Sequence, residues 1–570
     1  MMEEKELTGY PSIDKPWLKY YSEEAIRADV PKGTIFQNIY DHNRAYPQDV
    51  ALLYFGKKIT YRQLFREIEK AEKAFLACGV RRGDNVALCV PATPEAIYAI
   101  LALNKIGANA NMLNPTFTQQ QLTDRINDTE AALLLVVGEL YAQLEDVIPQ
   151  TKIKTVISYP AVNSLGPLVK FMKKARDIPH TIPWNQFIAM GRNTSPFAPA
   201  PYEKDVPAIM VYSSGTTGAS KGIQLTNDGI NATITQYEYA GFVMSRQDRY
   251  FAQVPIWFST GIAATMLVPL CLGVTVILEP LYDFELFYQH ISKYKPNFMV
   301  TAVGLVDYLR NKKEIDPAYK EFKYLAIGGE YVVPHAEVEF NNWLKENGCS
   351  SALQKGYGMC ECGGTVTATH PQSNKIGSVG IPLANVTVSA FDLVTGKELK
   401  YGQRGEIRVL SPCRMKEYYK RPDATSDYFR TDENGNVWAC TGDMGYVSED
   451  GNIYVDGRIN DSYIDEQGNT IYLFDIERSI LEVEAVRQCK VVVSEIDGKQ
   501  THVAHVVFSL GKGTAENIME QVKSVCAKKL PANHQPQLLK LYSDALPVAP
   551  SGKLNTAKMK ADTQDLISIQ

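Results

Sequence analysis

A loop rich in glycine and hydroxyl side chains stands out in the sequence. Residues 212–222 read YSSGTTGASKG, directly after the apolar run VPAIMV, and we expect a helix to begin near Thr226. Backbone N–H groups, Ser and Thr hydroxyls and the one lysine, Lys221, can together surround a polyphosphate. The loop lacks the Gly-Lys-Ser/Thr ending of a Walker A motif. It therefore predicts a phosphate site of a different kind.

Four later segments carry side chains suited to nucleotide chemistry. They read GYGMCE (356–361), TGD (441–443), GRIND (457–461) and LPVAPSGK (546–553). Together with the phosphate loop, and in this order, they resemble the motifs of the adenylate-forming superfamily, which includes acyl-CoA synthetases, luciferases and nonribosomal adenylation domains. The resemblance extends over most of the chain, since the N-terminal part is also similar to that of the superfamily.

The resemblance implies attack of a carboxylate on the α-phosphorus of ATP. Both reactants are anionic, so catalysis depends mainly on charge neutralisation and positioning. Lys553 would bridge the carboxylate and the α-phosphate, while Glu361 and Thr216 would hold Mg²⁺. Asp443 would accept hydrogen bonds from the ribose hydroxyls, and Tyr357 would stack on the base. The other residues implied to bind the nucleotide are Ser213, Ser214, Gly215, Thr217, Gly218, Lys221, Gly329, Glu330, Gly358 and Arg458.

The acyl-binding segment is less informative. In PIWFSTG (255–261), Phe258 stands where many acyl-CoA synthetases have the histidine of a PxxH segment. No acidic residue follows that could bind an α-amino group, which favours a fatty or aromatic acid over an amino acid. Trp257 and Phe258 could equally be ordinary core residues. The predicted pocket consists of Trp257, Phe258, Gly304, Tyr331, Cys360 and Gly363.

The predicted hinge, at Asn460 and Asp461, departs from the superfamily pattern. The stretch from Arg458 to Gly468 is one residue longer than usual, and Asp465 stands where lysine is common. Leu473 likewise replaces a common proline, and Cys360 a usual threonine. The thiol acceptor therefore stays open between CoA and the phosphopantetheine of a separate carrier protein. A luciferase-type oxygenation and a catalytically silent nucleotide-binding protein are weaker alternatives.

The elements expected to position these residues alternate between helix and strand. A capping-box pattern at Thr60 and Gln63 predicts a helix, and apolar runs at 85–90 and 131–137 predict strands of a mostly parallel sheet. Short strands and turns dominate 387–455. The predicted class is α/β. A large N-terminal α/β domain (1–459), with parallel sheets and a small β-rich subdomain, is followed by a small mobile C-terminal α+β domain (460–570).

Composition excludes several classes of protein. The 570 residues are 45% hydrophobic and 22% charged, with a net charge of −5, which excludes a disordered chain and makes a nucleic-acid partner unexpected. Ten dispersed cysteines without a C-x-x-C pair predict a reducing compartment and no structural metal.

Targeting and membrane signals are weak. The N-terminus does not resemble a signal peptide, and the apolar run 262–278 contains Pro269 and Gly273, which predicts a buried helix, a turn and a strand. The basic stretch 168–176 could contact a membrane surface or an acidic partner, or be a solvated helix. We expect a cytoplasmic acid–thiol ligase without a transmembrane segment, with ATP, Mg²⁺, CoA and a small carboxylic acid as cofactors and partners.

Overall fold

The computed structural model describes residues 7–165, 178–195, 201–213, 220–312, 316–464, 467–508, 514–543, 545–547 and 554–569. Part of what the sequence singles out lies outside these ranges: Ser214, Gly215, Thr216, Thr217, Gly218, Asp465, Lys553 and the basic stretch 168–176. The predicted roles of these residues therefore stay predictions.

The N-terminal half of the large domain is built on a seven-stranded sheet of order β7-β6-β5-β3-β4-β8-β9. Its neighbours pair in parallel except for β8 and β9, which form an antiparallel hairpin. The strands are β3 (Asn85–Cys89), β4 (Asn109–Met112), β5 (Leu133–Val137), β6 (Thr155–Tyr159), β7 (Ile182–Pro183), β8 (Pro207–Tyr212) and β9 (Gly222–Thr226). The helices of this part are α4 (Tyr61–Ala77), α5 (Pro94–Ile106), α6 (Gln119–Thr129) and α8 (Trp184–Met190).

Local capping fixes two of the predicted helix starts. Thr60 and Gln63 form the reciprocal capping box at the start of α4, as predicted. The Thr226 side chain accepts a hydrogen bond from Gly229 at the start of α9 (Asn227–Glu238), although strand β9 intervenes between the phosphate loop and this helix. The sequence thus predicted both helix starts but missed the strand.

A second, nine-stranded sheet has the order β16-β15-β14-β13-β12-β10-β11-β1-β2 and a parallel centre. Its strands are β1 (Val50–Tyr54), β2 (Lys57–Thr60), β10 (Arg249–Ala252), β11 (Thr275–Leu278), β12 (Phe298–Thr301), β13 (Tyr324–Gly328), β14 (Gln354–Tyr357), β15 (Thr367–Ala368) and β16 (Ile381–Pro382). The helices around it are α3 (Ile35–Asn43), α9, α10 (Val268–Cys271), α11 (Phe284–Tyr294), α12 (Val303–Arg310) and α13 (Pro334–Glu346). The largest apolar cluster is shared by both sheets and by α3, α4, α5, α9 and α10, which joins the two halves into one body.

The apolar run 262–278 folds as predicted. A π-helix (Thr260–Leu267) continues into α10, the chain turns at Gly273 with φ of +83°, and β11 follows. Every residue of the helical part from Gly261 to Cys271 is buried. In the described ranges, no helix combines the length and apolarity needed to cross a bilayer.

The β-rich subdomain has the order β17-β18-β20-β19, with β21 paired to β20. It comprises β17 (Thr387–Phe391), β18 (Gly405–Leu410), α14 (Pro422–Tyr428), β19 (Phe429–Thr431), β20 (Val437–Val447) and β21 (Ile453–Arg458). The N-terminal segment, α1 (Pro11–Asp14) and α2 (Glu23–Arg27), packs against this subdomain and the nine-stranded sheet. Helix α1 contacts β17, and the wholly buried Trp17, which lies between the two helices, clusters with Ile381 of β16.

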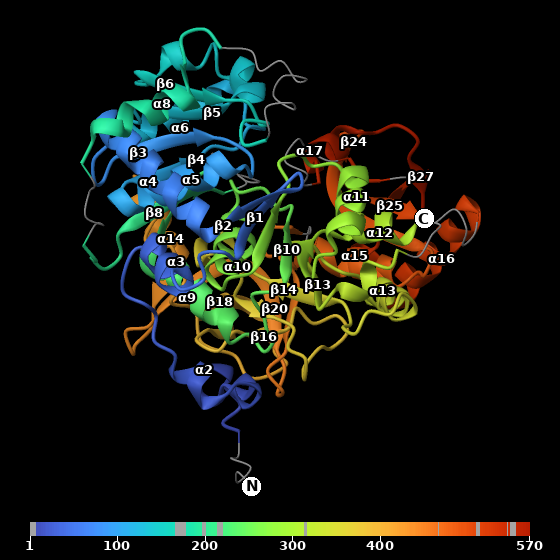
Figure 1. Ribbon diagram of the computed structural model, residues 1–570. Coiled ribbons are helices and arrows are strands. Elements are labelled where there is room, and N and C mark those ends of the chain that lie inside the picture. The colour runs from blue at the N-terminus through green and yellow to red at the C-terminus, as the bar shows by residue number, and fades with distance from the viewer. Residues whose placement is uncertain are drawn as a thin grey trace.

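The C-terminal unit has its own core, formed by α15, α16 and the sheet β24-β25-β26-β27. Its elements are β22 (Ser462–Ile464), β23 (Thr470–Tyr472), α15 (Leu473–Leu481), β24 (Val486–Ile496), β25 (Lys499–Phe508), α16 (Ala515–Lys529), β26 (Leu538–Tyr542), α17 (Thr556–Ala561) and β27 (Ile567–Ser568). Figure 1 shows this red and orange unit beside α13 of the large domain, and Val333 at the start of α13 joins its core. The fold class predicted from sequence is confirmed, whereas the domain division at 459/460 stays a prediction.

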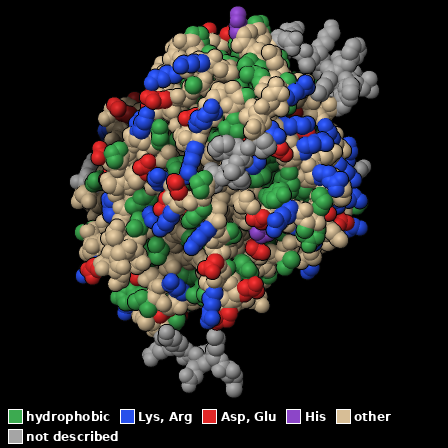
Figure 2. Space-filling view, turned by 60° about the vertical axis from the view of Figure 1, so that its left-hand side comes forward, with side chains coloured by type: hydrophobic (Ala, Val, Ile, Leu, Met, Phe, Trp, Pro, Cys, Tyr) green, Lys and Arg blue, Asp and Glu red, His purple; other side chains and the backbone are tan. Residues whose placement is uncertain are grey.

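The surface charge is mixed. Figure 2 shows acidic and basic side chains interspersed over much of one face, with several basic side chains gathered near one edge. This mixture agrees with the nearly equal totals of 59 basic and 64 acidic residues in the chain.

Candidate active site

Four neighbouring parallel strands deliver the predicted site segments to one edge of the nine-stranded sheet. Trp257 and Phe258 follow β10, Gly304 follows β12, Tyr331 follows β13, and Glu361 follows β14. These strands are successive neighbours in the order β10-β12-β13-β14. Ligands of open α/β sheets bind outside the carboxyl ends of the strands. The topology therefore brings the expected acyl and nucleotide residues to the same edge.

The phosphate loop is pinned at its base by the β8–β9 hairpin. Ser213 donates its backbone N–H to the Lys221 carbonyl at 3.0 Å, and the Lys221 N–H donates to Ser213 Oγ, also at 3.0 Å. At the next pair of the hairpin, Tyr212 lies opposite Gly222, where a Cβ would lie 2.9 Å from Met210 Sδ. The two ends of the loop are thus held together, and Lys221 is anchored at the strand end.

Glu361 is presented by a tight loop between β14 and β15. A Cβ at Gly358 would lie 1.6 Å from the Gly364 carbonyl oxygen, and Gly363 has φ of +73°. The Gly364 N–H donates to the Met359 carbonyl at 3.1 Å and closes the loop. Only glycine fits at Gly358, because the opposing atom belongs to the backbone. The half-buried Glu361 is therefore held in one place relative to β14.

Tyr418 joins Glu361 to Lys221 and was missed at the sequence level. Its hydroxyl donates to Glu361 Oε1 at 2.7 Å, and the Lys221 ammonium lies 4.8 Å from the centre of its ring. No local pattern marks this tyrosine, because both partners are distant in sequence. Only the pairing of β9 with the segment around Tyr418, which the structure reveals, brings this tyrosine to the site.

The predicted ribose site is assembled around Asp443 on β20. Oδ2 accepts a hydrogen bond from the Tyr357 hydroxyl at 2.5 Å, and Oδ1 pairs with Arg458 Nε at 3.0 Å. Arg458 lies directly opposite Asp443 in the β20–β21 ladder and also donates to the Thr441 carbonyl at 2.9 Å. Burial raises the pKa of the Asp443 carboxyl above its usual range, although Arg458 opposes this effect. The three predicted residues Tyr357, Asp443 and Arg458 are thus in direct contact.

The segment after β13 has two roles in the structure. Gly329 adopts φ of +78°, and the Glu330 carboxylate accepts a hydrogen bond from the Val303 N–H at 3.0 Å, where α12 begins. Glu330 therefore caps a helix, an interaction that sequence analysis did not foresee. Tyr331 is 42% exposed, with the Arg478 guanidinium of the C-terminal unit 5.5 Å from its ring centre. It lies at the contact between the two domains.

The predicted acyl residues lie in three places: four near the start of the π-helix, Tyr331 at the domain contact and Gly304 beside α11. Trp257 and Phe258 are half-buried, with ring centres 6.3 Å apart. A Cβ at Gly364 would approach the Thr260 backbone at 3.2 Å, so the Glu361 loop, with Cys360 and Gly363, packs onto this helix start. Gly304 packs instead beside Phe284, with 3.6 Å available to a Cβ. The structure thus brings five of the six predicted pocket residues to the sheet edge near Glu361 or the domain contact and sets Gly304 beside α11.

Asp461, one of the two predicted hinge residues, is held by the C-terminal unit. The Asp461 carboxylate pairs with Lys490 Nζ at 2.6 Å, and its carbonyl accepts the Leu473 N–H at 2.9 Å. Asn460, Asp461 and Lys490 help to line a polar cavity of about 270 Å³ in the C-terminal unit. This cavity was not predicted.

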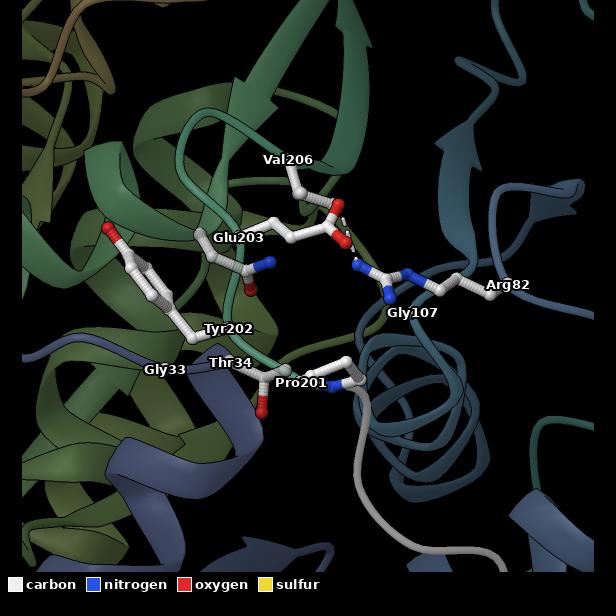
Figure 3. Close-up of a pocket in the computed structure, with 9 residues that line it drawn as sticks. Gly33, Thr34, Arg82, Gly107, Pro201, Tyr202, Glu203 and Val206 are labelled. Atoms are coloured by element: carbon white, nitrogen blue, oxygen red, sulfur yellow. Dashed lines mark ion pairs between the residues drawn. The ribbon is translucent and has the colours of Figure 1, made fainter.

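A second pocket lies in the large domain, away from these residues. Figure 3 shows Arg82 and Glu203 pointing toward each other across it, and they pair at 2.8 Å. The Tyr202 hydroxyl donates to Asp228 at 2.9 Å. The charged groups of this pocket are thus neutralised internally, which leaves the sheet edge as the candidate active site.

Comparison with known proteins agrees with this geometry. A family model described as AMP-binding enzyme matches residues 39–419. The chain belongs to this family. Relatives of this AMP-binding enzyme include a long-chain-fatty-acid–CoA ligase of Bacillus subtilis (strain 168), 26% identical over 559 residues, which cover 95% of this chain and 96% of the relative. Another is 4-coumarate–CoA ligase 1 of Petroselinum crispum, 24% identical over 517 residues and 89% of each chain.

Solved structures confirm the adenylate-forming fold of this AMP-binding enzyme. ATP-bound MatB from Rhodopseudomonas palustris matches with a TM-score of 0.79 and 21% identity, covering 94% of this chain and 99% of that one. The anthranilate CoA ligase AuaEII in complex with anthranoyl-AMP matches with a TM-score of 0.79 and 20% identity, covering 94% and 98%. The predicted superfamily resemblance is confirmed.

The donor set around Glu361 fits Mg²⁺ that arrives with a nucleotide. The described residues hold no group of three or more His, Cys, Asp or Glu side chains placed to bind a metal. Glu361 Oε1 is engaged by Tyr418, and this is the one hydrogen bond to its carboxylate in the described part of the chain. Mg²⁺ commonly binds through one or two carboxylates, with water and phosphate oxygens completing the octahedron. A single carboxylate that is joined to Lys221 through Tyr418 satisfies this requirement.

Proposed function

We propose that this AMP-binding enzyme is an AMP-forming acyl-CoA synthetase, an acid–thiol ligase. It activates a fatty or aromatic carboxylic acid with ATP and then transfers the acyl group to the thiol of CoA. The observation that carries the proposal is a continuous series of contacts from Asp443 through Tyr357 and its loop to Glu361, and through Tyr418 to Lys221. The residues proposed as ribose acceptor, metal ligand and phosphate cation thus follow one another in the order that MgATP requires.

The first half-reaction forms an acyl-adenylate. A carboxylate oxygen attacks the α-phosphorus, the bond to the bridging oxygen of the β-phosphate breaks, and pyrophosphate leaves. Asp443 orients the ribose through its hydroxyls, and Lys221 neutralises negative charge on the phosphates. Lys553 is proposed to bridge the attacking carboxylate and the α-phosphate. Glu361 and Thr216 would hold Mg²⁺, which would supply further positive charge to the phosphate oxygens.

The second half-reaction forms the thioester. The CoA sulfur attacks the acyl carbon, the carbon–oxygen bond to the phosphate breaks, and AMP leaves. Support for CoA as the acceptor comes from the relatives and solved structures named above as CoA ligases. Phosphopantetheine on a carrier protein is the alternative outcome of the assay. A cytoplasmic location stays a prediction from cysteine usage.

Support for the acid class comes from Trp257 and Phe258, two half-buried aromatic side chains just before the π-helix onto which the Glu361 loop packs. Relatives named for long-chain fatty acids and for 4-coumarate agree with an acid that lacks an α-amino group. A pocket of this composition binds apolar chains or rings by removing their surface from water.

Carboxylate-dependent exchange of pyrophosphate into ATP tests the first half-reaction. A panel of fatty, aromatic and amino acids is assayed, followed by thioester detection with and without CoA. We expect fatty or aromatic acids to support exchange and CoA to be consumed. An amino acid as the best substrate, or exchange without any thioester, would contradict the proposal.

Lys553→Ala separates the two steps. It should lower adenylation by roughly 10² to 10³, the effect of losing one transition-state charge donor. Thioester formation from supplied acyl-adenylate should change much less. Equal loss of both steps in a folded variant would remove Lys553 from this role.

A further inference from the structure

The segment that carries Tyr418 runs along the edge of β9. Lys416 donates its N–H to the Gln224 carbonyl at 2.9 Å, and the Gln224 N–H donates to the Glu417 carbonyl at 3.1 Å. The Tyr419 N–H donates to the Gly222 carbonyl at 2.8 Å, which sets Tyr418 opposite Ile223. The backbone of Tyr418 is therefore fixed next to the strand end that bears Lys221.

The same segment also holds the loop that bears Glu361. The Met415 N–H donates to the Glu361 carbonyl at 2.6 Å, and the Tyr418 N–H is satisfied by Thr425 Oγ1 at 3.0 Å. Tyr418 is only 5% exposed, and its ring packs edge-on against Tyr428 at 5.7 Å between ring centres. A buried ring with a fixed backbone has little rotational freedom, so its hydroxyl and its face keep constant directions.

The Tyr418 side chain makes two different interactions. The hydroxyl donates to Glu361 at 2.7 Å, and the ring face lies 4.8 Å from the Lys221 ammonium. A lysine side chain loses considerable rotamer freedom when it is ordered, and a ring face limits where its ammonium can lie. Without the hydroxyl, the Glu361 carboxylate keeps no other hydrogen bond from the described residues. One tyrosine thus sets the relative position of a carboxylate and a cation that come from different strands.

We propose that Tyr418 is a positioning residue for nucleotide activation, which holds Glu361 through its hydroxyl and Lys221 through its ring so that both meet the same MgATP. The inference rests on the proposed function, because it assigns Glu361 to the metal and Lys221 to the phosphates. The proposal gives the segment 415–419 a role in the active site, although this segment belongs neither to the phosphate loop nor to the strand ends of the nine-stranded sheet.

Equilibrium binding distinguishes this role from a purely structural one. The affinities of ATP with Mg²⁺ and of ATP in excess EDTA are measured by calorimetry for wild type, Tyr418→Phe, Tyr418→Leu and Tyr419→Phe. Tyr418→Phe should weaken MgATP about 10- to 100-fold, the effect of a hydrogen bond to a charged group, and change metal-free ATP less than about threefold. Tyr418→Leu also removes the ring from Lys221 and should weaken both forms. Tyr419→Phe, which removes the neighbouring hydroxyl, should match wild type.

A double-mutant cycle supplies the second test. In a Glu361→Ala background, Tyr418→Phe should have no further effect on MgATP affinity, because the partner of the hydroxyl is already absent. Equal weakening of MgATP and metal-free ATP by Tyr418→Phe, no weakening of either, or full additivity with Glu361→Ala would each overturn the proposal. If Tyr418→Phe does not fold, Tyr418→His, which keeps a ring and a donor, must retain more MgATP selectivity than Tyr418→Leu.

Failure of the proposed function is visible separately. Nucleotide binding needs no acid, so the affinities decide the role of Tyr418 even if no acid supports pyrophosphate exchange in the wild type. Absence of exchange over the whole panel would reject the synthetase assignment. Intact exchange with unchanged MgATP selectivity in Tyr418→Phe would reject the positioning role alone.

Discussion

Asp443→Asn is expected to weaken ATP binding without unfolding the protein. The carboxylate uses Oδ2 for the Tyr357 hydroxyl at 2.5 Å and Oδ1 for Arg458 at 3.0 Å. An amide has one acceptor oxygen and a donor in place of the other, so its oxygen can accept only one of these two hydrogen bonds and the side chain offers one acceptor fewer to the ribose. A hydrogen bond to a charged group contributes about 1.5–3 kcal/mol. This amounts to roughly a tenfold to hundredfold higher KM for ATP.

The cost of the same substitution to stability is smaller. Asp443 is buried, but the Arg458 side chain is 62% exposed, so water already screens the pair. Loss of such a pair costs about 1 kcal/mol or less. The asparagine also matches the volume of aspartate. The variant should therefore remain folded, and its binding defect should be local.

Deoxynucleotides make the test specific. Exchange assays compare ATP with 2′-deoxy-ATP and 3′-deoxy-ATP for wild type, Asp443→Asn and the control Asp392→Asn, whose carboxylate accepts the Thr395 N–H at 2.7 Å in a surface turn. Wild type and control should discriminate against both deoxynucleotides, and Asp443→Asn should discriminate much less. Full discrimination by Asp443→Asn, or an equal loss in the control, would refute the ribose assignment.

Three further outcomes are expected. Gly358→Ala should abolish ATP binding measured by calorimetry while circular dichroism stays native, since its Cβ would lie 1.6 Å from a backbone oxygen of its own loop; native affinity would contradict this. Lys355→Ala should lower the free energy of unfolding in urea by about 3–5 kcal/mol, because it leaves the buried Glu337 carboxylate without its ion-pair partner. The double variant Lys355→Met/Glu337→Leu should recover most of this loss, and an equally unstable double variant would argue against an unpaired charge as the cause. Burial lowers the pKa of His502 and His505 to about 4, below the unfolded value. The free energy of unfolding should therefore be highest above about pH 6.5 and should fall as the pH drops from there through 4. Each histidine should account for about 1.4 kcal/mol for every unit by which its pKa is lowered. Unfolding of His502→Gln/His505→Gln from pH 7 to 4 should show a flatter profile, and an unchanged slope would exclude these histidines.

Features encoded by local sequence were predictable. The capping box at Thr60 and Gln63 and the N-cap at Thr226 depend on hydrogen bonds within one turn, and both occur as expected. The strands and the long helix of the C-terminal unit follow from their apolar periodicity. Motif residues Asp443 and Arg458 also meet, because they lie opposite each other in the ladder of β20 and β21, and Tyr357 on β14 joins them through its hydrogen bond to Asp443.

Features that depend on distant pairing were not predictable from one sequence. Tyr418 reaches Glu361 only because its segment pairs with β9, and nothing within either segment indicates this. The helix-capping role of Glu330 was missed for the same reason, since its partner Val303 follows a different strand of the sheet. Short hairpins such as β22–β23 have too few residues for a periodic signal.

The structure gives the predicted hinge a physical basis. Arg458 is tied to the large domain through Asp443 and the Thr441 carbonyl. Asp461, three residues later, is tied to the C-terminal unit through Lys490. Rotation that keeps both attachments must therefore take place between these two residues, where Asn460 lies. The hinge itself stays a prediction; these two attachments would place it at Asn460, the position that the sequence motif alone indicated.

Contacts away from the hinge must separate if the C-terminal unit rotates. Asp456 on β21 accepts Arg404 Nε at 2.6 Å and also pairs with Arg478 on α15. Arg404 in turn pairs with Asp475 on the same helix at 2.9 Å. Rotation would separate Arg478 and Asp475 from Asp456 and Arg404, whereas the pair between Asp456 and Arg404 belongs to the large domain and can persist. The Asp456 charge therefore keeps a partner in either arrangement, which lowers the electrostatic barrier to moving the domain.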